Sequence, residues 1–455
     1  MYNIQKLYAL VLKHPLRHLL LLGLLIRVLI LVIYQGVSIF PDSRAYIDLS
    51  QYIANLSLDN YSGGRTPGFP LLIALTNKNL IITIIIQQII GLINICLIYD
   101  FSLNKTQNKT ISFWITFITI TFLHFNFYEL AILTETLSLF LLLLSFWIIQ
   151  KYKLLTSNGK LIFFIFLSIT MSFLYLTRPM FIYFPLLFII FFIIKNFKQR
   201  IKRIVLPVIV IFTLSGISFY SWCSLNKKNI GYFSSTYYFG YNLTQMATSF
   251  FDLVPEEHKE IRDIFIKHRT FIEKNKSHDV YPMTVWYAAD DLLELTNLKT
   301  QDLSNKLGKI SIELFKEYPH LYLKQVLVSW KSFWGTESTF LLNKEKFKYK
   351  IPKYLVYGIW KIIQQYILIL INILFILFSI KKIFQFVTLK FKIFDFDLFL
   401  VIVVMGGSVA QALVAYGDNS RFCFPYLPLI VYFVITNLFL LKTIIPKANA
   451  KNITA

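Results

Sequence analysis

The chain has 455 residues, of which 56% are hydrophobic, 17% are aromatic and only 15% are charged. A water-soluble core of ordinary proportions cannot hide so much apolar surface, so the composition excludes a typical soluble protein and indicates a lipid environment. The net charge of +22 does not indicate a nucleic-acid partner, because the basic residues fall in short clusters between apolar runs rather than on one soluble face.

Apolar runs long enough to cross a hydrocarbon core of about 30 Å recur along the chain. The first run follows a basic N-terminal stretch and does not end in a small-residue cleavage site, so we expect it to be retained as a span. The predicted fold class is an all-α polytopic membrane protein. Its expected spans, about ten in number, lie at about 17–39, 79–99, 111–127, 130–150, 161–177, 180–194, 204–223, 354–380, 397–415 and 423–441.

Basic residues indicate how these spans are oriented. If the spans alternate, the Lys and Arg clusters near 105–109, 151–160, 195–203, 381–392 and 442–447 lie on the same side as the N-terminus. The positive-inside rule assigns that side to the cytoplasm. A composition rich in Lys, Asn, Ile and Phe is typical of an AT-rich bacterial genome, so we expect a multi-pass protein of the plasma (inner) membrane with both termini in the cytoplasm.

The segment 224–352 is too polar to contain spans and too long to be a simple connection, so we expect a small, mainly helical external domain there. It follows a transmembrane region of about seven spans at 1–223, which includes the first outer loop at 40–78. About three further spans at 353–441 and a cytoplasmic tail at 442–455 complete the predicted organisation.

Ionisable residues on the predicted outer side gather in loops and short turns, so function is expected on the outer face. Asp42 lies where the first span leaves the membrane, directly after a proline. One interpretation makes it the N-cap of an interfacial helix in which Arg44 and Asp48 form an i,i+4 ion pair. The other makes it a catalytic carboxylate. The ionisable residues of this outer group are Asp42, Asp48, Arg65, Glu129, Arg178, Asp418 and Arg421.

Five short motifs carry a family resemblance, and all fall near the same predicted membrane surface. They resemble the GT-C class of membrane glycosyltransferases, in the bacterial branch related to the protein mannosyltransferases and to the aminoarabinose transferase of lipid A. The protein mannosyltransferases have an acidic pair where this chain has Asp42-Ser43, which leaves the substrate and the metal dependence open. The motifs are Pro41-Asp42-Ser43-x-x-Tyr46, Arg65-x-Pro67-Gly68-Phe69-Pro70, Leu133-Thr134-Glu135-Thr136, Thr177-Arg178-Pro179 and Asn419-Ser420-Arg421-Phe422.

The resemblance implies transfer of a sugar from a polyprenyl-phosphate-linked donor to an envelope glycolipid, glycan or protein on the outer face of the membrane. It also implies that Asp42 is the catalytic group. An inverting displacement at an anomeric carbon needs a base near the acceptor hydroxyl and positive charge near the departing phosphate. Membrane lipid is a further expected partner. A divalent cation stays an open alternative, and no cofactor is assigned from the sequence.

Three arginines are the candidate ligands of the donor phosphate, because a guanidinium stays protonated and binds phosphate through a planar fork. Each also has a structural interpretation. Arg65 could brace a turn, Arg178 could end a helix or extend to the membrane surface, and Arg421 could pair with Asp418.

Other polar residues are candidates to support the site or to contact the acceptor, namely Tyr46, Asp48, Glu135 and Asp418. Glu135 is expected about one turn inside the fourth span, either as a second site carboxylate or in an ion pair with Arg178 or Arg421. The aromatic run 231–241 would bind the acceptor or anchor the chain at the membrane interface. Arg27, in the first span, is expected to be paired or to extend to the surface.

Two other functions fit parts of the pattern. A glycan polymerase or ligase would take a lipid diphosphate oligosaccharide, but we expect its arginines within a large outer loop. A lipid-linked-sugar flippase or transporter would have broken helices and polar residues near the midplane, often in two related halves. The polar residues here crowd one surface, which favours the transferase.

Overall fold

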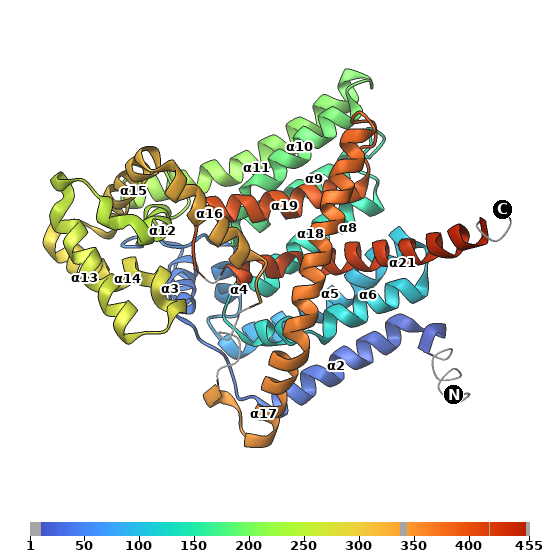
Figure 1. Ribbon diagram of the computed structural model, residues 1–455, viewed down its shortest axis with the longest axis horizontal. Coiled ribbons are helices and arrows are strands. Elements are labelled where there is room, and N and C mark those ends of the chain that lie inside the picture. Colours follow the sequence, from blue (N-terminus) through green and yellow to red (C-terminus); the bar gives the residue numbers. More distant parts are fainter. Residues whose placement is uncertain (1–10, 337–343, 418, 452–455) are drawn as a thin grey trace.

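The computed structural model describes residues 11–336, 344–417 and 419–451. The described chain is all-helical apart from two isolated β-bridges, as the sequence predicts. Figure 1 shows the long helices side by side, with a group of shorter helices at one end. The N-terminal elements are α2 (Pro15–Ile33), α3 (Pro41–Ala54), α4 (Gly68–Leu75), α5 (Leu80–Thr106), α6 (Lys109–Thr121), α7 (Leu123–Phe127), η1 (Tyr128–Leu130), α8 (Glu135–Lys151), α9 (Leu161–Thr177), η2 (Pro179–Ile182), α10 (Tyr183–Asn196) and α11 (Ile201–Ile230).

The shorter helices follow α11 and form a unit with its own hydrophobic core. Gly240 allows α12 and α15 to approach closely, because a Cβ at this position would lie 1.8 Å from the backbone oxygen of Ser304. These helices therefore form a distinct unit of residues 238–333, which we call the external unit after its predicted location. Its elements are α12 (Tyr238–Ala247), η3 (Thr248–Leu253), η4 (Glu256–His258), α13 (Lys259–Asn275), η5 (His278–Met283), α14 (Thr284–Thr296), α15 (Thr300–Glu317) and α16 (Pro319–Phe333).

The chain then returns to the bundle. Asp395 caps the long helix that begins at Phe396, since its side chain accepts a hydrogen bond from the Leu398 amide at 2.8 Å. Helix α2 begins and helix α21 ends at the same end of the molecule, opposite the external unit (Figure 1). The elements are η7 (Lys344–Lys346), α17 (Lys350–Gly358), the π-helical η8 (Ile359–Gln364), α18 (Gln365–Thr388), α19 (Phe396–Val414), α20 (Ser420–Cys423), η9 (Phe424–Tyr426) and α21 (Leu427–Lys451).

In the described chain, seven helices are long and apolar enough to cross a membrane, which makes the protein a multi-pass membrane protein. The number rises to eight if α6 and the following segment Leu123–Leu130, which are bent by 62° relative to each other, form one span. All ten predicted spans coincide with helices, but α8 and α9 have only 17 residues each. They lie at the lower limit for a span, so the count by length is smaller than the ten expected.

The exit of the first span is fixed by pairing on both sides. The Ser38 amide donates to the Leu130 carbonyl at 2.8 Å, and the Ile132 amide donates to the Ser38 carbonyl at 3.0 Å. On the other side the Gln35 amide donates to the Lys346 carbonyl at 2.8 Å. These contacts place the start of α3 beside the segment that leads into α8.

Candidate active site

Asp42 does not cap helix α3. Its N-cap is Phe40, whose amide donates to the Ser43 hydroxyl at 2.9 Å, so Asp42 is the second residue of the helix and its carboxylate is free to reach elsewhere. Arg44 and Asp48 are both exposed and form no ion pair with each other. The capping interpretation of Asp42 is therefore wrong.

The Asp42 carboxylate contacts two of the predicted arginines. Its Oδ1 accepts from Arg65 Nη2 at 2.7 Å, and its Oδ2 accepts from Arg421 Nη1 at 3.0 Å. Arg421 continues the chain of charges, because its Nε donates to Glu135 Oε1 at 2.7 Å. Arg178 Nη2 donates to the same oxygen at 3.0 Å. The five residues form one continuous ion-pair chain, Arg65–Asp42–Arg421–Glu135–Arg178.

Local geometry explains how the arginines converge. Arg178 ends α9 in an extended conformation, with φ −146° and ψ 102°, which a following proline favours. Gly68 at the start of α4 packs directly on the end of α9, because a Cβ there would lie 2.6 Å from the Thr177 amide nitrogen. The turn carrying Arg65 is therefore held close to Arg178.

Arg421 is placed by the residue two positions before it. Asn419 donates through Nδ2 to the Ser329 carbonyl at 3.2 Å and to the Ala415 carbonyl at 3.1 Å. Ser329 belongs to α16, so the external unit and the end of α19 together fix the start of α20. This contact was not predicted, since nothing in the sequence relates residues ninety positions apart.

Glu135 is the first residue of α8 and does not lie a turn inside the span, which corrects the sequence expectation. The segment just before it is not helical, and in it the Ile132 amide pairs with the Ser38 carbonyl. Glu135 is fully buried, whereas the Asp42 side chain is 35% exposed. The ion-pair chain is therefore buried at Glu135 and partly exposed at Asp42.

The arginines keep Asp42 ionised. Burial raises the pKa of its carboxyl. The charges of Arg65 and Arg421 and the hydrogen bonds from them lower the pKa by more than burial raises it, so the pKa falls from 3.8 to about 2. With three arginines and two carboxylates, the chain of charges carries a net charge of +1.

Within the ion-pair chain, three buried side-chain atoms have no hydrogen-bond partner among the described residues. They are Arg65 Nε, Arg178 Nη1 and Glu135 Oε2. Buried polar atoms of native proteins are nearly always satisfied, so unpaired ones in a cluster indicate a place where a polar ligand or water binds. Two of the three are donors, which suits an anion.

Aromatic rings hold two of the guanidinium groups. The Arg65 guanidinium lies 4.8 Å from the ring centre of Tyr46 and 4.6 Å from that of Tyr238, and the Arg178 guanidinium lies 4.8 Å from the ring of Phe422. Tyr46 was singled out from the sequence, but Tyr238 was not. The only sequence signal for it is its place in the aromatic run 231–241.

Of the other predicted candidates, Asp48 and Glu129 form no contact with this chain of charges in the described structure. Asp48 is exposed on α3, and Asp418 lies outside the described residues. Glu129 forms a buried ion pair with Arg27, in which Nε donates to Oε2 at 2.9 Å and Nη2 donates to Oε1 at 2.5 Å. Arg27 is thus paired, as one sequence interpretation held.

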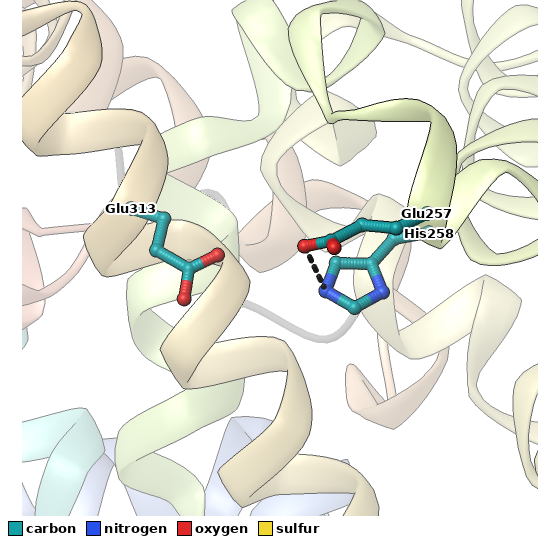
Figure 2. Close-up of side chains that lie close together, drawn as sticks. All are labelled: Glu257, His258 and Glu313. Atoms are coloured by element: carbon teal, nitrogen blue, oxygen red, sulfur yellow. Dashed lines mark ion pairs between the residues drawn. The ribbon is translucent and has the colours of Figure 1, made fainter.

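A cluster with metal-ligand chemistry occurs in the external unit. Figure 2 shows Glu257, His258 and Glu313, whose ligand atoms all lie within 4.8 Å of one another in the described structure. Both glutamates are exposed and His258 Nε2 lies 3.4 Å from Glu257, which an ordinary surface ion pair explains. At Asp42 the nearby guanidinium groups disfavour a divalent cation, so the residues there do not fit a metal site.

Comparisons with known proteins give one structural similarity to report. No protein-family model matches the chain, and no curated protein matches it. Among solved structures, the archaeal oligosaccharyltransferase AglB from Archaeoglobus fulgidus, in complex with an inhibitory peptide and a dolichol-phosphate, is similar with a TM-score of 0.46 and 13% sequence identity. The alignment covers 97% of this chain and 52% of that chain, so this chain spans about half the length of that structure. A similarity this low does not determine a function.

Proposed function

We propose that the protein is a membrane glycosyltransferase that moves a sugar from a polyprenyl-phosphate-linked donor to an envelope acceptor, with Asp42 as the base. One observation carries the proposal. Residues selected from separate motifs form a single chain of ion pairs that is buried at Glu135 and accessible at Asp42. Burying these charges costs desolvation free energy that the ion pairs can fail to recover, so stability alone does not explain the arrangement. A functional site does.

The charge of the site supports a phosphate ligand. A sugar joined to a polyprenyl monophosphate is a phosphodiester with a single negative charge, which complements the net charge of +1 on the five residues. Arg65 Nε and Arg178 Nη1 are buried donors without partners among the described residues, so they are available to phosphate oxygens. A lipid donor would present its head group at the membrane surface, where α3 begins.

The reaction follows from these positions. The acceptor hydroxyl gives its proton to the Asp42 carboxylate, and its oxygen forms a bond to the anomeric carbon while the bond from that carbon to the phosphate oxygen breaks. The electron pair leaves with polyprenyl phosphate, whose added negative charge the arginines stabilise. A bound phosphate competes with Asp42 for Arg65 and Arg421, which raises the pKa of Asp42 toward its ordinary value and makes it a better base.

The test is sugar transfer by Asp42→Asn. Asparagine keeps the size and an acceptor oxygen but cannot take a proton, so we expect roughly a hundredfold or greater loss of transfer. Asp48→Asn is the matched control, since Asp48 is exposed on the same helix. Transfer from a panel of radiolabelled polyprenyl-phosphate sugars is measured in membranes, together with the amount of inserted protein. Normal transfer by a well-inserted Asp42→Asn protein would remove Asp42 from the mechanism.

A further inference from the structure

Tyr238 of the external unit contacts one of the site arginines directly. The Arg65 guanidinium lies between the rings of Tyr46 on α3 and Tyr238 on α12, at 4.8 and 4.6 Å from their centres. A ring stacked on a guanidinium occupies its face and leaves the in-plane N–H groups free. One of these, Nη2, donates to Asp42, and Nε has no partner among the described residues.

The turn that carries Arg65 is also held by its backbone. The Tyr237 amide donates to the Gly63 carbonyl at 3.1 Å, and Gln301 Nε2 on α15 donates to the Ser62 carbonyl at 2.7 Å. Gly63 has φ +80°, and a Cβ at this position would lie 2.4 Å from the side chain of Ile230. The turn is therefore shaped to fit against the end of α11 and the beginning of the external unit.

The external unit holds the second arginine of Asp42 as well. Ser329 on α16 accepts a hydrogen bond from Asn419, directly before the short helix that carries Arg421. Both arginines that bind Asp42 therefore depend on contacts with the external unit for their position. This dependence matters most when a phosphate draws an arginine away from Asp42, because the ion pair then no longer fixes the side chain.

We propose that Tyr238 is a positioning residue, which keeps the Arg65 guanidinium in place while its N–H groups pass from Asp42 to the phosphate of the donor. The external unit thereby completes the donor site on the membrane helices. This inference rests on the proposed function for its ligand, a polyprenyl phosphate, but the contacts between Tyr238 and Arg65 stand without it.

The test compares Tyr238→Phe with Tyr238→Leu. Phenylalanine keeps the ring, so its KM for the donor should stay within about twofold of the wild type. Leucine removes the ring, so we expect the KM to rise about tenfold with a smaller change in kcat. Tyr287→Leu, at an exposed tyrosine of α14, is the control for loss of an aromatic ring in the same unit. Equal effects of Tyr238→Phe and Tyr238→Leu would overturn the proposal.

A double-mutant comparison separates positioning from general damage. If Tyr238 acts through Arg65, then Tyr238→Leu should add little to the loss caused by Arg65→Gln, whereas independent effects would multiply. If Tyr238→Leu does not accumulate in membranes, Gln301→Ala loosens the same turn and should also raise the KM. Unchanged donor KM in Gln301→Ala and multiplied losses in the double variant would each contradict the inference.

Binding of a short-chain polyprenyl monophosphate to the purified protein distinguishes the inference from the proposed function. Tyr238→Leu and Arg65→Gln should weaken this binding to a similar extent, whether or not sugar is transferred. If binding weakens in both variants but no sugar donor supports transfer, the positioning role stands and the glycosyltransferase proposal fails. If sugar transfer occurs but Tyr238→Leu changes neither the binding of polyprenyl phosphate nor the donor KM, the positioning role fails and the proposed function stands.

Discussion

At the residue scale, the protonation of Asp42 has a predictable dependence on its arginine partners. Because its folded pKa is about 2 and its ordinary value is 3.8, its ion pairs contribute fully above the ordinary value and are lost as the pH falls toward 2. We therefore expect kcat/KM to show no acid limb from Asp42 above about pH 4. Arg65→Gln removes a charge that lowers this pKa, so its acid limb should move to higher pH. An unmoved limb in the pH profile would show that Arg65 does not act on Asp42.

Arg421 offers a test of guanidinium geometry. It uses two different nitrogens, Nε toward Glu135 and Nη1 toward Asp42, whereas lysine has a single nitrogen. Arg421→Lys should therefore lose one of the two ion pairs and weaken donor binding by about tenfold or more. Donor KM measured in membranes with matched protein abundance checks this. A lysine variant with unchanged donor KM would assign Arg421 a structural role.

The sequence indicated which ionisable residues are candidates for the site, but it did not indicate how they pair with one another. Asp42, Arg65, Arg178, Arg421 and Glu135 were chosen because they lie in motifs that resemble those of the GT-C class and that fall near one predicted membrane surface. Their pairing order could not be chosen, since it depends on which nitrogen of each guanidinium faces which oxygen. Tyr238 was missed because a ring that stacks on an arginine has the same sequence appearance as an interfacial aromatic anchor.

At the element scale, helix starts depended on contacts far away in the sequence. Helix α8 was expected to begin near residue 130 because its apolar pattern does, but the chain pairs with Ser38 at Ile132 and the helix begins only at Glu135. Local pattern predicted that a helix exists here, and the long-range pairing decided where it starts. The same pairing brings Glu135 to the level of Asp42.

Gly91 on α5 makes room for the ion pair between α2 and η1. A Cβ at residue 91 would lie 1.9 Å from Glu129 Oε1 and 2.4 Å from Arg27 Nη2. Gly91→Ala should therefore displace this buried pair and lower the free energy of unfolding by about 3 kcal/mol or more. Thermal unfolding of the purified protein in detergent measures the change, with Gly216→Ala as control, because a Cβ there meets nothing within 4 Å. Equal stability of the two variants would contradict the prediction.

At the scale of the whole molecule, composition and the long apolar runs predicted the all-α polytopic fold class. The sequence also predicted an external domain at 224–352, and the structure has a helical unit with its own core within that range. It could not predict that this unit reaches into the candidate site, because those contacts join Tyr238 and Ser329 to residues distant in the chain. Only tertiary packing brings them together.

The membrane orientation is the prediction on which every statement about an outer face depends. Figure 1 places the start of α2 and the end of α21 opposite the external unit, as an alternating arrangement with both termini on one side requires. Leu56, which is 94% exposed, and the exposed Ser277 should lie outside the cell, whereas Gln107 and Thr388 should face the cytoplasm with the basic clusters.

Single cysteines at these positions, in a chain whose three natural cysteines are replaced by alanine, are treated with a membrane-impermeant thiol reagent in intact cells. Positions 56 and 277 should react before lysis and positions 107 and 388 only after it, because the reagent cannot cross the bilayer. Reaction of 107 with intact cells would invert the orientation, and Asp42 would then face the cytoplasm, where an outer-face donor could not reach it.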